Sequence, residues 1–377
     1  MVVSDKPPRN AFVAGARKVY NPIGFSKGYN FILWFIFIGA LFGFSLARFE
    51  YINFWGVFCN PNSPGGDGAL PGECFYYTQA GRYQIGIILH LATVVPAAFL
   101  ACFQFVPVIR HKALIFHRIN GWLITLLVTL GTAGALMIAR RAAGGGVDVQ
   151  TLIGLLAIAF LGSIAIAIIN VKRLQIDQHR AWMIRAWSYG GSIITLRIGL
   201  IIGAMVVSQI GGYYSAQPCD KVNFTVGGQA NTMFLYPECA AFFSGQNLNQ
   251  QALVYANFSG QNAMEVGAAF NIAFGPAAWL ALALHVFGAE LYLRLTPAEH
   301  ERLKNVSYQR QLEAGMNHPG RAGLTADRLG DANEWHPLAA VDNNHNHNNN
   351  NSNHNHVSDS DEPFKNSPGV AQYGYTS

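Results

Sequence analysis

Charged residues are scarce in this sequence of 377 residues, since only 12% are Asp, Glu, Lys or Arg. Several enzyme signatures are missing as well: there is no CxxC, no HExxH, no P-loop and no glycine-rich dinucleotide motif. These absences give no support to a thioredoxin-like redox protein, a zinc protease or a nucleotide-binding enzyme. What is abundant is apolar surface, because 51% of the residues are hydrophobic and the mean hydropathy is +0.21.

The apolar residues occur in continuous blocks and do not alternate with polar residues at a helical or strand spacing. Six blocks contain roughly 18 or more apolar residues, which is enough for a helix to cross about 30 Å of hydrocarbon. They cover residues 29–48, 83–108, 121–139, 151–169, 186–209 and 267–292. No pair of acidic residues inside them could form a proton relay. The sequence therefore predicts an all-α, multi-pass integral membrane helix bundle, with six transmembrane helices around a four-helix core at residues 83–208.

The positions of basic residues predict the orientation. Lys and Arg are frequent before the first block, after the second and after the fourth, which places these segments and both termini in the cytosol. Arg140 and Arg141 are an exception, because their loop should lie outside. The first block has the pattern of a signal anchor and no cleavage site. The net charge of +5 is spread over these flanks, and we expect no nucleic-acid partner.

Four of the five cysteines fall in the two long loops predicted to lie outside, residues 49–82 and 210–266. They are Cys59 and Cys74 in the first loop, and Cys219 and Cys239 in the second. Pairing within each loop is the short-range solution, and four free thiols are the alternative. Disulfides require an oxidising compartment, so we expect the plasma membrane or a membrane of the secretory pathway. The second loop also holds two glycosylation sequons, at Asn223 and Asn257.

Three regions follow from these patterns. Residues 1–28 are expected to be a polar cytosolic arm, and residues 29–292 the transmembrane domain. Residues 293–377 are expected to be a cytosolic tail that is largely disordered after a short helix beginning at Thr296. Residues 343–356 are almost entirely Asn and His; such a tract can bind metal, but it is more often inert.

An arginine lies deep in the fifth apolar block. At about 1.5 Å per residue, Arg197 is about 14 Å below the outer surface, and His90 on the second block is at a similar depth. A buried arginine costs on the order of 3 kcal/mol or more unless it is satisfied, and no acidic residue lies at this depth on any helix. Thr195 is one candidate partner, and an anionic ligand is another. The alternatives are an arginine bonded to carbonyls and a neutral histidine between helices.

A second set of polar residues is predicted at the cytosolic rim. His117, His179 and His285 fall at one depth and are candidate ligands for haem or another metal. Gln104, Arg118 and Arg180 are candidate ligand-binding residues at the same level. The competing interpretation is that the two His-Arg pairs bind lipid head groups and helix ends.

Five short motifs occur in one order: Leu89-His90, Phe103–Val106, His117–Trp122, His179–Arg185 and Thr195–Arg197. Together they resemble the membrane family described as domain of unknown function 2306, over about residues 83–208, and the outer loops resemble a eukaryotic, fungal-type elaboration. The resemblance implies a membrane core without an assigned role. The plan is also loosely similar to that of two-haem transmembrane cytochromes, but His90 has no histidine partner at its depth.

Three hypotheses for the function follow, and the sequence does not decide whether the chain is an enzyme. The first is a haem-associated or redox-active membrane protein, with haem b as the cofactor. The second is a binding or transport module in which an anionic small molecule or lipid contacts Arg197 and His90. The third is an accessory or structural membrane protein whose polar groups hold the helices together. The lipid bilayer is a partner in all three.

Overall fold

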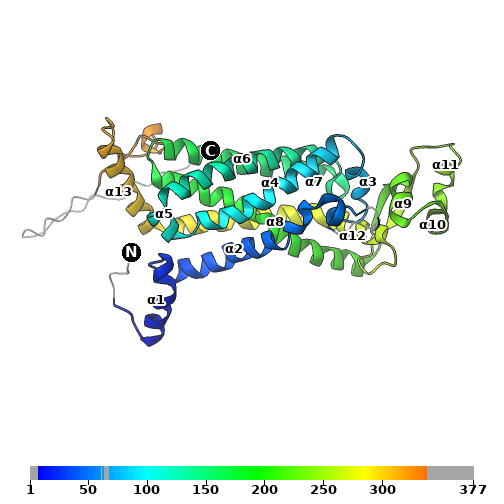
Figure 1. Ribbon diagram of the computed structural model, residues 1–377, viewed down its shortest axis with the longest axis horizontal. Helices are drawn as coiled ribbons and strands as arrows, with labels where there is room; N and C mark the ends of the chain where they lie inside the picture. Colours follow the sequence, from blue (N-terminus) through cyan, green and yellow to red (C-terminus); the bar gives the residue numbers. More distant parts are fainter. Residues whose placement is uncertain (1–6, 61, 63–67, 338–377) are drawn as a thin grey trace, which may run out of the picture. The chain divides into compact units, whose positions relative to one another are not determined.

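The computed structural model describes residues 7–60, 62 and 68–337, all within one compact unit, Met1–Pro337. Six helices in the described part are long and apolar enough to cross a membrane. They are α2 (Gly28–Leu46), α4 (Arg82–Gln104), α6 (Leu114–Ile138), α7 (Val147–Lys172), α8 (Ile176–Ile210) and α12 (Ala263–Leu295). The predicted six-helix membrane bundle is therefore confirmed, and Figure 1 shows these helices running side by side.

Shorter elements connect and flank the bundle. The helices are α1 (Ala11–Ile23), α3 (Cys74–Tyr77), α5 (Pro107–Lys112), α9 (Cys219–Val226), α10 (Gln229–Leu235), α11 (Ala240–Phe243) and α13 (Pro297–Glu313). Single helical turns are η1 (Phe49–Ile52), η2 (Phe54–Phe58), η3 (Ala142–Gly145), η4 (Pro237–Cys239) and η5 (Asp327–Leu329). The sequence did not indicate the small antiparallel pair of β1 (Tyr214–Pro218) and β2 (Gln251–Tyr255), in which Tyr214 lies opposite Tyr255.

Helix α8 is the centre of the bundle, with α12 packed along one side and α7 along another. Small residues allow the close approach of α8 and α12: a Cβ added to Gly199 would lie 3.4 Å from the Cβ of Ala277, and one added to Gly203 would lie 3.1 Å from that of Ala273. Small residues spaced by four let membrane helices come into van der Waals contact. The last helix is thus part of the central core, which the sequence had limited to residues 83–208.

Helices α4 and α6 form the second close pair. A Cβ on Gly134 would come within 2.5 Å of the Gly86 carbonyl oxygen and 2.8 Å of the His90 backbone nitrogen. Backbone atoms cannot move aside as a side chain can, so only glycine fits at Gly134. This contact fixes the position of His90 relative to α6.

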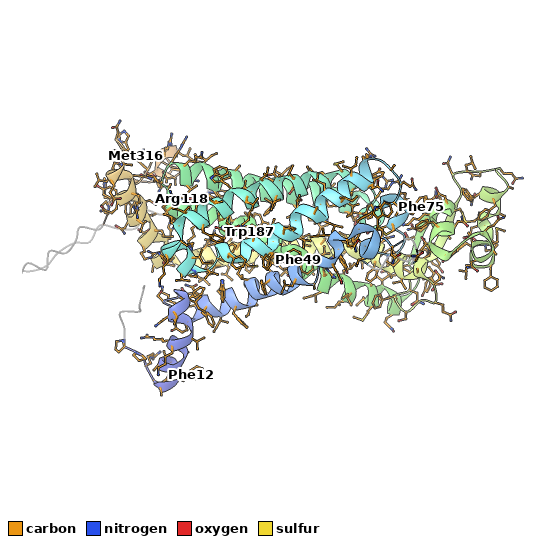
Figure 2. The ribbon with its side chains drawn as sticks, in the orientation of Figure 1. Phe12, Phe49, Phe75, Arg118, Trp187 and Met316 are labelled. Carbon is orange, nitrogen blue, oxygen red and sulfur yellow. A yellow bond between two sulfur atoms is a disulfide. The ribbon has the colours of Figure 1, made fainter. Side chains whose placement is uncertain are left out.

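One end of the bundle, which we call the disulfide end, carries α3, α9, α10 and α11. Both predicted disulfides are present, Cys59–Cys74 and Cys219–Cys239, and Cys102 is a buried free thiol. Figure 2 labels Phe75 at this end, and Arg118 lies near the opposite end. We call that opposite end, where α5 and α13 lie, the arginine end.

At the arginine end a buried polar network attaches α13 and residues 314–337 to the turn between α7 and α8. Gln311 is fully buried; its Nε2 donates to Gln175 Oε1 (2.9 Å) and its Oε1 accepts from the Gly320 N–H (2.6 Å). Gln175 Oε1 also accepts from the Gly323 N–H, and Asn170 Oδ1 accepts from the Leu324 N–H. The disorder expected after residue 304 is therefore not seen over residues 305–337, which have a defined structure. The His-rich tract at residues 343–356 lies outside the described residues.

The segment predicted to be a polar arm contains a helix. Residues 11–23 form α1, which begins where the Asn10 side chain accepts a hydrogen bond from the Val13 N–H (2.8 Å). Tyr20 is the buried residue of this helix, and its ring stacks near Phe31 of α2.

Candidate functional site

Arg197 is one of several polar side chains in the described residues with a buried nitrogen that has no hydrogen-bond partner, and it lies within a membrane span. Its Nε is buried and has no hydrogen-bond partner, and the guanidinium forms no ion pair with a carboxylate of the described residues. Leu196 and Leu200, beside it on α8, are almost completely buried. A guanidinium has five N–H donors in a planar fork, so this group retains donor capacity that the described protein groups do not use.

His90 of α4 lies within electrostatic range of Arg197. Its Nδ1 is 2.8 Å from the Gly131 carbonyl oxygen of α6, which selects the tautomer with a proton on Nδ1. Thr195 does not face this pair, because its hydroxyl is 2.8 Å from Nε2 of His285. The structure thus brings two of the three predicted residues together and separates the third.

A carboxylate that the sequence analysis missed lies within electrostatic range of Arg197. Glu73, in the loop before α3, is 8% exposed and accepts hydrogen bonds from the Leu70 N–H (3.2 Å) and the Ala143 N–H. Burial raises the pKa of Glu73, while the Ala143 N–H, Lys221 and Arg197 act in the opposite direction. The sequence analysis considered acidic residues on the helices only, and this carboxylate comes from a loop.

Positive charge nevertheless exceeds negative charge around Glu73. Lys221 of α9 is 3% exposed, its Nζ donates to Gln217 Oε1 (2.8 Å), and burial lowers its pKa to about 8. Tyr77 is 1% exposed and interacts electrostatically with both Glu73 and Arg197. We refer to His90, Arg197, Glu73, Tyr77 and Lys221 as the Arg197 cluster. It contains two cationic side chains and one carboxylate.

Arg140 and Arg141, the exceptions to the predicted distribution of basic residues, both contact neighbouring groups. Arg140 Nη1 donates to the Gly145 carbonyl oxygen (3.1 Å), and the Arg141 guanidinium lies 4.3 Å from the ring centre of Tyr76. Arg140 thus has a carbonyl partner and Arg141 an aromatic one, while Nε of Arg141 is buried without a hydrogen-bond partner among the described residues.

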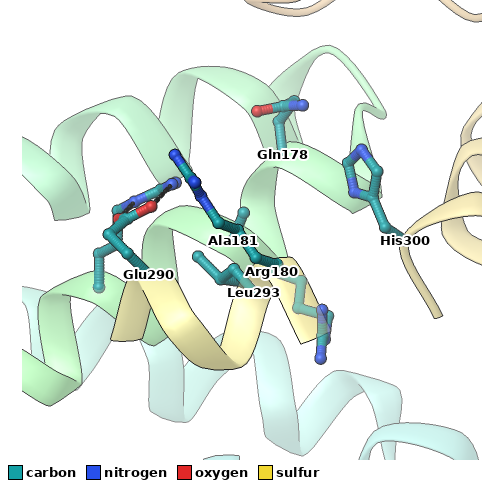
Figure 3. A pocket seen from close by; sticks show the side chains of 8 residues that line it. Gln178, Arg180, Ala181, Glu290, Leu293 and His300 are labelled. Carbon is teal, nitrogen blue, oxygen red and sulfur yellow. Dashed lines mark hydrogen bonds and ion pairs between the residues drawn. The ribbon is translucent and has the colours of Figure 1, made fainter. Parts of the chain in front are cut away.

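A second site lies at the arginine end, where a pocket of about 220 Å³ opens between α8, α12 and α13 (Figure 3). Its lining residues are Gln178, Arg180, Ala181, Arg185, Glu290, Leu293, Arg294 and His300. Arg185 and Glu290 form a bidentate ion pair with N–O distances of 2.5 and 2.9 Å. We call this site the arginine pocket. Of its residues the sequence had singled out only Arg180.

The three candidate histidines at this depth have different environments. Both ring nitrogens of His285 are occupied, by the Ser188 carbonyl oxygen (2.7 Å) and the Thr195 hydroxyl (2.8 Å). His179 Nδ1 is 2.9 Å from the Ala167 carbonyl oxygen, whereas His117 Nδ1 is buried without a partner among the described residues. Within the described ranges no group of three or more His, Cys, Asp or Glu side chains is arranged to hold a metal ion.

The remaining candidates are dispersed. Gln104 Nε2 donates to the His117 carbonyl oxygen (3.2 Å) and so joins α4 to α6, while Arg118 is exposed. Asn223 is partly exposed, and its Oδ1 accepts from the Thr232 hydroxyl (3.4 Å). Asn257 is also partly exposed, and glycosylation of the two asparagines stays a prediction.

The residues that the sequence analysis missed are Glu73, Lys221, Glu290, Arg294 and His300. One signal was available for Glu73, which is adjacent to the bridged Cys74 and is thereby drawn onto the bundle. The others lie at helix ends or in the segment between α8 and α12, where a single charged residue is common and carries no distinguishing pattern.

Comparisons with known proteins agree with this architecture. Residues 87–216 match the family described as "Predicted membrane protein (DUF2306)", which confirms the resemblance stated above. The chain is 24% identical over 309 residues to "Ava biosynthesis cluster protein G" of Aspergillus versicolor, covering 72% of this chain and 90% of that protein. No solved structure matches.

Proposed function

We propose that this membrane protein binds an anionic small molecule, or the anionic head group of a lipid, at the Arg197 cluster. The observation that carries the proposal is the buried Nε of Arg197, which has no hydrogen-bond partner. A carboxylate or phosphate accepts from a guanidinium through two parallel hydrogen bonds, and this fits the unused donors. Intramembrane arginines typically mark ligand or ion pathways, because their cost is high when they serve no partner.

The surrounding charges favour an anion. Glu73 uses its oxygens to accept from two backbone N–H groups, so the guanidinium of Arg197 is not engaged by it in an ion pair. With Lys221 nearby, the cluster retains a positive excess at neutral pH. His90 adds an imidazole, whose ring nitrogens can donate or accept.

The orientation belongs to the same proposal. The disulfide end is placed outside the cytosol, because its two disulfides require an oxidising compartment. Both termini and the arginine end are then cytosolic, in accordance with the positive-inside rule. The ligand would reach Arg197 from the outer half of the bilayer or from its outer surface.

The test uses the full chain purified in detergent and two matched pairs of probes: oleate with oleyl alcohol, and phosphatidic acid with phosphatidylcholine. Native mass spectrometry measures how much of each probe the protein retains. We expect preference for an anionic probe, reduced at least tenfold in Arg197→Met, because a hydrogen bond to a charged group contributes about 1.5–3 kcal/mol. Whichever pair shows the preference distinguishes a fatty-acid carboxylate from a phospholipid.

Two further variants complete the design. Arg197→Lys keeps the charge but loses the planar fork, so binding should be intermediate. Arg82→Gln removes an exposed arginine from the start of α4 and should bind like the wild type. Equal binding of the anionic probes by wild type and Arg197→Met would refute the proposal and would favour the accessory role, in which Arg197 only holds helices together.

A haem-associated function is the second candidate. His179 directs Nδ1 to the Ala167 carbonyl, which leaves Nε2 for a ligand, and His117 lies within electrostatic range of it. That orientation is common among metal-binding histidines. The occupied nitrogens of His285 make this proposal the weaker of the two. An absorption spectrum of the purified protein decides it: a Soret band supports haem b, and its absence from protein expressed with haem available contradicts it.

A further inference from the structure

We propose that the arginine pocket is a separate binding site for a phosphomonoester, at the opposite end of α8 from the Arg197 cluster. Twelve to seventeen residues of α8 separate Arg180 and Arg185 from Arg197, which corresponds to roughly 18–26 Å along the helix. The two sites therefore cannot share one small ligand. Three helices, α8, α12 and α13, contribute side chains to the pocket (Figure 3).

The charges of the pocket favour a polyanion. Glu290 is its one acidic lining residue, and both of its oxygens are engaged by Arg185, at 2.5 and 2.9 Å. Arg180 and Arg294 form no ion pair with a carboxylate of the described part of the chain. Two arginine charges therefore remain for a ligand, and His300 adds a third nitrogen-bearing side chain.

Arg180 is also held in position. Its Nη2 donates to the Tyr292 hydroxyl (3.0 Å), and its guanidinium lies 5.5 Å from the centre of that ring. The Tyr292 hydroxyl donates in turn to Asn30 Oδ1 of α2 (3.1 Å). A guanidinium fixed through one nitrogen loses less conformational entropy when the others bind an anion. This geometry favours a phosphate group, which accepts several N–H donors at once.

The size and place of the pocket define the ligand further. About 220 Å³ is less than the roughly 300–1,000 Å³ of pockets for drug-sized ligands, so a head group or free phosphate fits and a whole lipid does not. Leu293 lines the pocket near the end of the last membrane span, where head groups lie. Basic pockets at helix ends commonly bind lipid phosphates. The phosphomonoester could therefore come from a phosphorylated inositol lipid or from a soluble phosphate.

The experiment measures vesicle binding of the full purified chain in nanodiscs of phosphatidylcholine. The probes are vesicles with phosphatidylinositol 4-phosphate, vesicles of phosphatidylcholine alone, and inorganic phosphate as the competitor. At about 1 kcal/mol for each arginine near the surface, the double variant Arg180→Gln/Arg294→Gln should bind the phosphoinositide about 30-fold more weakly at low salt. Glu290→Gln should bind several-fold more tightly, because it releases Arg185.

Two controls give the result its meaning. Arg310→Gln removes an exposed arginine from α13 and should leave binding unchanged. The double variant should retain the Arg197-dependent binding of the anionic probes used for the Arg197 cluster, so failure of this proposal is distinguishable from failure of the proposed function. Displacement by millimolar phosphate supports a soluble phosphate as the ligand, and retention on the vesicles supports the lipid. Wild-type affinity in the double variant, or equal binding to phosphatidylcholine vesicles, would overturn the proposal.

Discussion

Replacement of Gln311 by alanine should detach the C-terminal segment from the bundle. The Gln311 amide is fully buried and bonds to four groups: the Gly320 N–H at 2.6 Å, the Ala322 N–H at 3.5 Å, the Arg173 carbonyl oxygen at 3.1 Å and Gln175 Oε1 at 2.9 Å. Without it, the Gly320 N–H and the Arg173 carbonyl lose these partners. A buried polar group without a partner costs about 1–3 kcal/mol. Two such groups lower the free energy of local opening by about 3 kcal/mol.

Hydrogen exchange measures this effect directly. A loss of about 3 kcal/mol corresponds to roughly 100-fold faster exchange in segments that open locally. The amides to follow are those of Gly320, Gly323 and Leu324, whose N–H groups donate to buried side chains. Limited proteolysis should cut residues 314–330 sooner in Gln311→Ala than in the wild type.

Gln309→Ala is the matched control, because Gln309 lies on the same helix and is exposed. It should exchange and be cleaved like the wild type. If Gln311→Ala keeps the wild-type protection, or if both variants lose it equally, the buried network does not hold the segment and the reasoning fails.

Three other predictions concern the disulfide end and the helix packing. Burial lowers the pKa of Lys221 to about 8, whereas a lysine in the unfolded chain has a pKa near 10.5. Because the unfolded state binds more protons between these pH values, the free energy of unfolding should rise by up to about 3 kcal/mol as the pH increases from 8 to 10.5. Chemical denaturation measures this rise, and Lys221→Met should abolish it. Replacement of Cys219 and Cys239 by serine should lower the free energy of unfolding by roughly 3 kcal/mol and lower the unfolding temperature. An unfolding temperature equal to that of the wild type would contradict a stabilising role of the disulfide. Gly134→Leu should lower the free energy of unfolding by at least about 1–3 kcal/mol, because the leucine Cβ would overlap the backbone of Gly86. A variant that melts at the wild-type temperature would contradict the close contact between α4 and α6.

The sequence predicted the spans and the cysteine pairs because both follow from local physical limits. Hydrocarbon thickness sets the length of an apolar run, and two cysteines in one loop have few other partners. Helix ends were less predictable: α8 begins at Ile176, ten residues before its apolar block, because polar residues such as Asp177 continue the helix beyond the hydrocarbon.

The site depended on tertiary contacts that no local pattern contains. Glu73 reaches the Arg197 cluster because the Cys59–Cys74 bridge and the Ala143 N–H hold its loop against the bundle. Gln175 and Gln311 are common polar residues, and composition favours an irregular segment around the second of them. Their structural role follows from the fact that the two side chains, 136 residues apart in the chain, are buried against each other.

The network at the arginine end also constrains the order of biosynthesis. Asn170 leaves the ribosome 154 residues before Leu324, the residue whose N–H it accepts from. The side-chain amides of the turn between α7 and α8 therefore stay without these partners while the disulfide-end segment and the last span are synthesised. This end can close only near the completion of translation, so a nascent chain stopped after α12 would leave Asn170 and Gln175 without the partners that residues 311–324 supply.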